Sequence, residues 1–107
     1  MKVVDPMSAA LEAVAAMPTR PATAAIYDAP AVRLVVFRLE PGQEVALHTN
    51  NGTVLLTVLS GSGTIIGGTE QRQVGPGEVV AYAPDEPHGM KAGAERFCLM
   101  ATIIRAC

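Results

Sequence analysis

Histidine is scarce in this chain, because only His48 and His88 occur among its 107 residues. Aromatic residues make up 4% of the sequence, and tryptophan is absent. Charged residues account for 17%, below the roughly 25% that is typical of globular domains. Any chemistry that needs an imidazole must therefore use these two positions.

The chain also lacks an excess of positive charge and any long apolar run. Its 8 Lys and Arg are outnumbered by 10 Asp and Glu, which leaves no basic face for a nucleic-acid backbone. No segment approaches the roughly 20 apolar residues of a membrane span. Asp5, Pro6 and Glu12 interrupt the alanine-rich start, so it does not resemble a secretion signal. We expect a cytoplasmic protein that binds neither nucleic acid nor membrane.

Cysteine is too rare for a disulfide framework. The two copies are Cys98 and Cys107, whereas a secreted domain of this size usually carries several bridges. We therefore expect two reduced thiols. Cys98 lies in an apolar run and is predicted to pack as a small hydrophobic residue.

Hydrophobic residues, in contrast, make up 50% of the chain, enough for one domain with a single core. The first part has helical periodicity over Pro6–Met17, where Asp5 precedes a proline at the first helical position and Pro18 follows the end. The expected apolar stripe comprises Met7, Ala10, Leu11 and Val14. The sequence predicts an N-terminal helical segment (1–21) that must pack on something, because a helix this short is marginal alone.

The remaining residues, 22–107, are expected to form β-structure, because short apolar segments alternate with Gly, Pro and Asn turns. There is no βα alternation, no phosphate-binding loop and no GxGxxG motif, which excludes P-loop and Rossmann-type proteins. The spacing of the turns predicts an all-β sandwich or barrel. The expected strands are Val32–Leu39, Gln43–His48, Val54–Leu59, Thr64–Ile66, Glu78–Ala83, His88–Lys91 and Arg96–Arg105, with a hairpin around Gly67-Gly68.

Two spaced motifs within this region resemble those of the cupin superfamily. In the first, Gly42 is followed after five residues by His48, then by Asn50 and, beyond an apolar strand, by Gly61. In the second, a strand opened by Gly75-Pro76-Gly77 runs through a proline turn to His88. The resemblance covers roughly residues 31–105. It implies an RmlC-like jelly-roll barrel, a double-stranded β-helix, which a short N-terminal α-helix precedes.

The resemblance also implies a metal site that has lost half of its ligands. Cupins bind metal through two histidines and a glutamate of the first motif and a histidine of the second. His48 matches the first histidine and His88 the last, whereas Asn50 replaces the second histidine. The glutamate position falls on Val54 or Leu55, neither of which can coordinate.

The residues themselves lead to the same candidate site. Residues 48 and 50 of an extended segment lie on one face, about 6–7 Å apart. Imidazole suits zinc, copper, iron or nickel, but a stable site usually needs at least three protein donors. Glu44 shares the face of His48 but lies about 13 Å along the strand, too far to replace a ligand. The candidate pocket residues are His48, Asn50, Tyr82 and His88, with His48 and His88 as candidate metal ligands.

Three functions follow as alternatives. The first is a single-domain cupin that binds a small molecule in the barrel interior, with a depleted metal site. The second is a metal-dependent enzyme of the dioxygenase, isomerase or decarboxylase type, which would use His48 and His88 to hold nickel, zinc, iron or manganese. The third is metal-free acid–base catalysis, with a histidine as base and Tyr82 as acid.

A homodimer is also expected. The segments Val54–Leu59 and Phe97–Ile104 contain too few polar residues for strands with one solvated face, and the N-terminal helix needs a surface to pack on. Exposed apolar area of this kind usually marks an interface.

Overall fold

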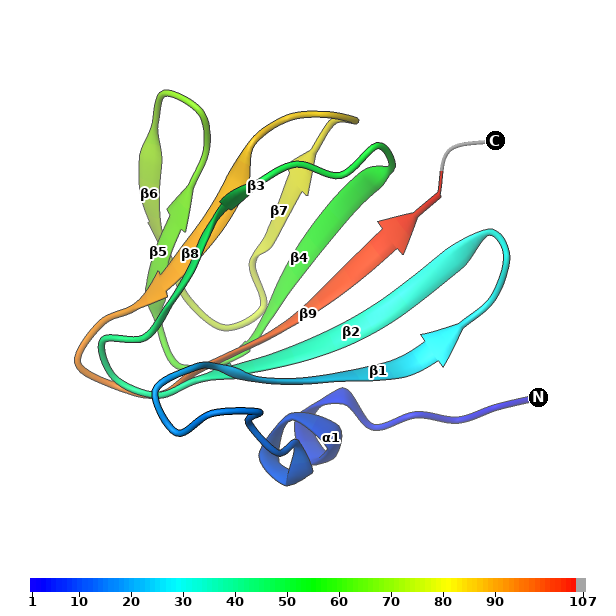
Figure 1. Cartoon of the computed structure of the whole chain (residues 1–107), viewed down its shortest axis with the longest axis horizontal. Helices are drawn as coiled ribbons and strands as arrows, with labels where there is room; N and C mark the ends of the chain where they lie inside the picture. The colour runs from blue at the N-terminus through cyan, green and yellow to red at the C-terminus, as the bar shows by residue number, and fades with distance from the viewer. Residues whose placement is uncertain (106–107) are drawn as a thin grey trace.

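The computed structural model describes residues 1–105, so Cys107 lies outside the described residues. One short helix precedes nine strands (Figure 1). In chain order the elements are α1 (Pro6–Glu12), β1 (Ala22–Asp28), β2 (Val32–Leu39), β3 (Glu44–His48), β4 (Thr53–Ser60), β5 (Gly63–Ile66), β6 (Gln71–Val74), β7 (Val79–Tyr82), β8 (His88–Ala92) and β9 (Phe97–Ile104).

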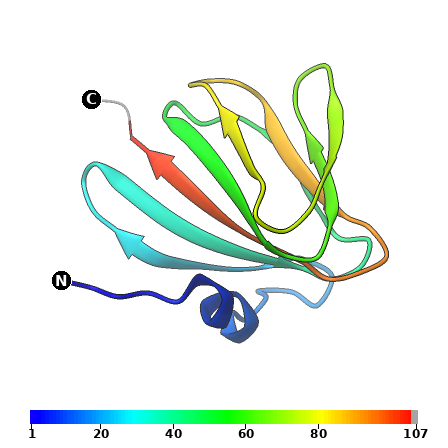
Figure 2. The same cartoon turned by 180° about the vertical axis from the view of Figure 1, so that it is seen from behind.

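The strands form two facing antiparallel sheets. One has the order β1-β2-β9-β4-β7 and the other β3-β8-β5-β6. Successive strands along the chain often belong to different sheets, and the main core lies between the two (Figures 1 and 2). This arrangement confirms the expected jelly-roll barrel. The β1–β2, β3–β4 and β7–β8 connections and the end of β9 lie at one end of the barrel, which we call the mouth (right in Figure 1).

Side-chain alternation explains how the five-stranded sheet buries both of its faces. On β4, Val54, Leu56 and Val58 are buried and contribute to the core between the sheets. On β2, Leu39 contributes to that core, whereas Val36 is buried on the opposite, outer face. Because neighbouring side chains of a strand point to opposite faces, a strand covered on both sides becomes almost wholly apolar.

Helix α1 covers part of this outer face. Ala10 packs there with Val36 and Cys98, and all three are fully buried. Cys98 is a free thiol that packs as a small hydrophobic residue, as predicted. Both views show α1 beside β1, away from the four-stranded sheet (Figures 1 and 2). No helix within residues 1–105 has the length and apolar character needed to span a bilayer.

The helix is shorter than the sequence predicts. The expected range was Pro6–Met17, but α1 ends at Glu12 because Ala13 adopts an extended backbone, with φ −60° and ψ 141°. Leu11 and Val14, expected in the apolar stripe, are 49% and 85% exposed. The predicted start is correct, because the Asp5 carboxylate accepts a hydrogen bond from the Ser8 backbone N–H and caps the helix.

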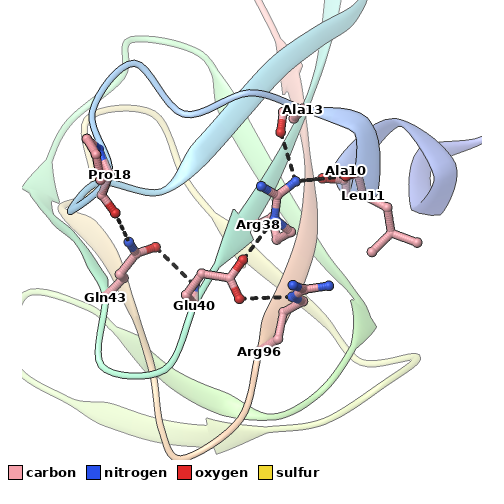
Figure 3. Close-up of polar contacts among 8 residues, drawn as sticks. All are labelled: Ala10, Leu11, Ala13, Pro18, Arg38, Glu40, Gln43 and Arg96. Atoms are coloured by element: carbon pink, nitrogen blue, oxygen red, sulfur yellow. Dashed lines mark hydrogen bonds and ion pairs between the residues drawn. The ribbon is translucent and has the colours of Figure 1, made fainter.

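A long-range contact explains where the helix ends. Nη1 of Arg38, on β2, donates to the carbonyl oxygens of Ala10 at 2.7 Å, Leu11 at 3.0 Å and Ala13 at 2.8 Å (Figure 3). Carbonyl groups in the last turn of a helix lack partners within it, and a guanidinium can satisfy several of them. Glu40 in turn bridges Arg38 and Arg96 (Figure 3).

The strand predictions were close. The range Val32–Leu39 is confirmed without change, and the other six expected strands differ from the observed ones by one residue at one or both ends. The predicted hairpin is formed by β5 and β6. Strands β1 and β6 were not assigned individually from the sequence. The division into a helical segment 1–21 and a barrel 22–107 stays a prediction.

Candidate functional site at the barrel mouth

The two histidines of the chain lie side by side. His48 is the last residue of β3 and pairs across the sheet with His88, the first residue of β8. Their ring centroids are 4.1 Å apart, and the ring planes are inclined by 59°. The pairing of β3 with β8 shifts register between Val45 and His48, which indicates a bulge at Ala46 and Leu47. This bulge brings His48 opposite His88.

Backbone carbonyl groups fix the tautomer of both rings. Nδ1 of His48 lies 2.9 Å from the Ala46 oxygen, and Nδ1 of His88 lies 3.1 Å from the Glu86 oxygen. A carbonyl oxygen only accepts, so each Nδ1 carries the proton and donates it. In the neutral rings each Nε2 therefore keeps a lone pair, which can accept a hydrogen bond or coordinate a cation.

Burial keeps His88 neutral. This residue is 4% exposed, whereas His48 is exposed. Removal from water disfavours the charged imidazole and lowers the pKa of His88 below its usual value, and the neighbouring His48 acts in the same direction. The hydrogen bond to the Glu86 backbone and the charge of Glu86 oppose this shift without reversing it. His88 is thus an acceptor at Nε2 near neutral pH.

Tyr82 completes the cluster but its hydroxyl is occupied. The ring lies 4.9 Å from that of His88, and the hydroxyl donates to the Ile66 carbonyl at 3.1 Å. Burial, with a smaller contribution from the charge of Glu86, raises the pKa of Tyr82 to about 12. A phenol with such a pKa is a poor general acid near neutrality, and this weakens the acid–base alternative.

The remaining positions of the family's metal site hold no additional donor. The Asn50 side-chain oxygen accepts a hydrogen bond from the Gly52 backbone N–H at 2.8 Å, so it stabilises the β3–β4 turn. Val54 is the inward-facing residue of the two candidates at the glutamate position and is 3% exposed. Among residues 1–105, no three His, Cys, Asp or Glu side chains form a group that could hold a metal ion. The donor set therefore does not fit a resident metal ion bound by protein ligands alone.

The described part of the structure has two marked hollows, and one of them shares Tyr82 with this cluster. One, of about 400 Å³, lies between β6 and β7 and is lined by Tyr82 together with charged residues such as Glu70 and Arg72. The other, of about 1170 Å³, is an open groove between the N-terminal segment and β3. The lining of neither hollow includes His48 or His88. The histidine pair thus adjoins the smaller hollow only through Tyr82 and lies toward the mouth end of the barrel.

Sequence reasoning missed one charged residue at the mouth. Arg33 of β2 lies opposite Ile103 of β9 in the sheet. Ile103 in turn lies opposite Val54 of β4, which lies opposite Tyr82 of β7. These four residues therefore form one row across the inner face of the sheet. The inward orientation of Arg33 could have been predicted from the sequence. Arg33 is an even number of residues from the inward-facing Leu39 on the same strand, so the two side chains lie on the same face. A charged side chain on the inner face of a sheet is uncommon, and that of Arg33 stays 43% exposed at the mouth.

Comparison with solved structures supports the fold. The chain superposes on TT1209 from Thermus thermophilus with a TM-score of 0.83, 21% identity, and coverage of 99% of this chain and 100% of that one. An RmlC-like cupin protein from Desulfovibrio desulfuricans has a TM-score of 0.81 and 27% identity, with 97% of this chain and 96% of that chain covered. DMSP lyase DddQ from Ruegeria pomeroyi has a TM-score of 0.75 and 17% identity over 80% of this chain and 47% of that chain.

Family comparison gives the assignment. No curated protein matches the chain. The model of the cupin domain, however, matches residues 35–103, which is more than half of the chain and includes the strands that carry both histidines. The two facing sheets and the two ordered motifs agree with that match. The chain therefore belongs to the cupin domain family.

Proposed function

We propose that this protein binds a small organic molecule at the mouth of its barrel and that it does so without a resident metal ion. The observation behind the proposal is the pair of adjacent imidazoles, 4.1 Å apart, in which each Nδ1 is occupied by a backbone carbonyl. The pair presents two Nε2 acceptors to a ligand. Such convergent polar groups beside apolar side chains are typical of small-molecule sites.

The depleted metal position supports a ligand rather than a metal. Where cupins that bind metal have a glutamate, the inward-facing residue here is Val54, and Asn50 is engaged in its own turn. A hydrocarbon at a former ligand position favours the carbon skeleton of an organic molecule. The hollow beside Tyr82 offers additional volume next to the histidine pair.

Native mass spectrometry of protein purified without added metal tests this proposal. We expect an organic adduct that is lost in His88→Ala but kept in Glu44→Ala, an exposed residue of β3 away from the pair. Metal content measured on the same sample should be far below one ion per chain. One equivalent of nickel, zinc, iron or manganese that disappears in His48→Ala would overturn the proposal.

A metal-dependent enzyme is the second candidate, because two imidazoles whose Nδ1 atoms donate to backbone carbonyl groups can bind a metal ion through Nε2. In that case His48 and His88 would bind the ion, and water or substrate would supply the other donors. The test is to add each of the four metals and to measure binding by calorimetry. This candidate requires submicromolar affinity that is abolished in both His48→Ala and His88→Ala.

We also propose a homodimer that forms through the outer face of the five-stranded sheet. The part of this face that α1 leaves uncovered carries exposed apolar side chains on three strands: Tyr27, Val79 and Ile104 are 38%, 57% and 46% exposed. Burying such side chains favours association. Light scattering at micromolar concentration should give the mass of a dimer, and Val79→Lys should shift it to a monomer. A monomeric wild-type protein would contradict this proposal.

The reduced, buried thiol of Cys98 supports a cytoplasmic location, which we include in the proposal. Cell fractionation followed by immunoblotting measures it directly. Recovery of the protein in a secreted or membrane fraction would count against it.

A further inference from the structure

We propose that the ligand of the barrel mouth is a small hydroxycarboxylic acid, whose carboxylate binds to Arg33 and whose hydroxyl donates to the histidine pair. This inference rests on the proposed function, because it names the chemical class of the molecule bound at the same site. One buried guanidinium nitrogen without a partner and two imidazole Nε2 atoms lie toward the same end of the barrel.

The guanidinium of Arg33 lacks a good partner. Its nearest carboxylate oxygen belongs to Asp28, 3.8 Å from Nε, which is beyond hydrogen-bonding distance. Nε is fully buried and has no hydrogen-bond partner in the described part of the chain, whereas the Arg33 side chain as a whole is 43% exposed. A buried donor of a charged group is costly when it stays unpaired, and a ligand that accepts its hydrogen bond recovers that cost.

Asp28 cannot neutralise both of the arginines beside it. Its Oδ1 accepts a hydrogen bond from Nη2 of Arg105 at 2.7 Å, and its Oδ2 lies near Arg33. One carboxylate thus faces two guanidinium groups, which leaves a surplus positive charge. A carboxylate is the preferred partner of a guanidinium, because its two oxygens match the planar arrangement of the donors.

Residue positions along β2 and β3 place Arg33 and the histidine pair toward the same end of the barrel. Lower down, Phe37 of β2 and Val45 of β3 pack against the same core and line the same groove, so β3 lies over this part of β2. Arg33 lies four residues from Phe37 along β2. His48 lies three residues from Val45 along β3, and the bulge of β3 lies between these two residues. At about 3.3 Å per residue both strands rise to the mouth by a similar distance.

The groups between them suit a short carbon chain. Ile103 and Val54 separate Arg33 from Tyr82 in the row across the sheet, and they form an apolar floor. On the opposite side, Nε2 of His88 accepts but cannot donate while the ring is neutral. The mouth therefore offers a cation on one side, apolar contacts in the middle and hydrogen-bond acceptors on the other side. A molecule with a carboxylate, a short hydrocarbon and a hydroxyl complements all three.

Acidic residues near the histidines give the ligand a direction. Asp85 and Glu86 lie in the turn immediately before His88, and the charge of Glu86 acts on both Tyr82 and His88. A carboxylate at that end would meet like charges, whereas at Arg33 it meets the surplus positive charge. The hydroxyl is therefore the group expected next to the histidines.

A three-carbon series tests the inference by NMR. The probes are lactate, propionate, which lacks the hydroxyl, and propylene glycol, which lacks the carboxylate. Only two histidines occur, so their ring signals report on the site without overlap. We expect lactate to shift both ring signals and to bind about tenfold more tightly than propylene glycol, the ratio expected for one charge-assisted hydrogen bond.

Variants then assign this preference to Arg33. In Arg33→Gln the advantage of lactate over propylene glycol should disappear. In Arg33→Lys, which keeps the charge but loses the planar pair of donors, it should fall several-fold. Arg20→Gln removes the same charge from an exposed residue of the N-terminal segment and should leave it unchanged. The ring signals also verify that each variant is folded.

Two outcomes overturn the inference. If propylene glycol shifts the histidine rings as effectively as lactate, or if Arg33→Gln binds lactate as the wild type does, the site binds small molecules but does not read a carboxylate through Arg33. The proposed function then survives. If no probe shifts either ring up to its solubility limit, the hydroxycarboxylic acid is wrong, and the organic adduct in native mass spectrometry decides separately whether the proposed function also fails.

Discussion

His48 and His88 are cross-strand partners on β3 and β8 whose rings lie 4.1 Å apart, yet only one of them is buried. The buried ring is held neutral, and the exposed ring faces water. The two histidines of this chain therefore differ in environment although they touch. This difference allows each to be followed separately in experiments.

Acidification should destabilise the protein through His88. Its folded-state pKa lies below 6.5, so the unfolded chain takes up the proton first as the pH falls. The contribution of this neutral ring to stability is complete above about pH 6.5 and is lost on acidification toward the folded-state pKa, with a slope of at most about 1.4 kcal/mol per pH unit. Urea unfolding between neutral and mildly acidic pH measures it.

The control for this prediction is His48→Gln, which should keep the larger part of the pH dependence, because burial and not the charge of His48 is its main cause, whereas His88→Gln should lose it. The lowered pKa can also be read directly from the two ring signals in an NMR titration. A ring of His88 that titrates at or above the usual histidine value would contradict the prediction.

Arg38→Gln should release α1 from the sheet. Nη1 of Arg38 contacts three carbonyl oxygens at the end of the helix, and its side chain is 17% exposed. Losing these bonds should lower the free energy of unfolding by about 1–3 kcal/mol, since charge-assisted hydrogen bonds are involved. It should also expose Cys98, which packs under the helix.

Thiol labelling measures this release. In a Cys107→Ser background only Cys98 remains to react, so its labelling rate reports how often α1 leaves the sheet. The matched control is Arg96→Gln, which removes the more exposed partner of Glu40 and should have little effect. Equal labelling rates in the two variants would show that Arg38 does not anchor the helix.

Gly89→Ala should separate the two histidines. A Cβ at Gly89 would lie 2.9 Å from the Val45 carbonyl oxygen and 3.3 Å from the Leu47 nitrogen, so the β3 backbone would have to move at its bulge. Overpacking of this kind typically costs about 1–3 kcal/mol. Gly93→Ala is the control, because a Cβ there meets nothing within 4 Å. Thermal unfolding and the histidine ring signals give the two readouts; unchanged ring signals would argue against a shift of β3.

Tyr82→Phe should affect stability more than binding. The hydroxyl donates to the Ile66 carbonyl, and its loss should lower the free energy of unfolding by about 1 kcal/mol. An absorbance titration of the wild type should show one tyrosine that ionises near pH 12, and this step should be missing in the variant. Tyr27→Phe is the comparison. A large loss of ligand binding in Tyr82→Phe would mean that the hydroxyl acts on the ligand.

The sequence predicted the barrel well because its signals are local. Apolar alternation in segments such as Val54–Leu59, with glycine and proline turns between them, defines strands without knowledge of their partners. The end of α1 was wrong for the opposite reason. Arg38, a residue far along the chain, binds the last carbonyl groups of the helix. The periodicity within Pro6–Met17 cannot predict that contact.

The candidate site was predictable in its members but not in its chemistry. Motif spacing identified His48 and His88, and the structure brings them together. Their tautomers depend on the carbonyl groups of Ala46 and Glu86, which no spacing rule reveals. Arg33 was overlooked because it lies outside both motifs, and its parity on the strand does not reveal that its Nε is buried without a good partner.

The anchoring of α1 by Arg38 has a consequence for how the chain folds during synthesis. The helix leaves the ribosome before the strands on which it packs, but seven residues cannot hold a helix alone. Its partners, Val36 and Cys98, lie on β2 and β9, and β9 follows β2 by more than fifty residues. The helix therefore cannot become stable before β9 has been made, and until then its apolar residues are available to chaperones.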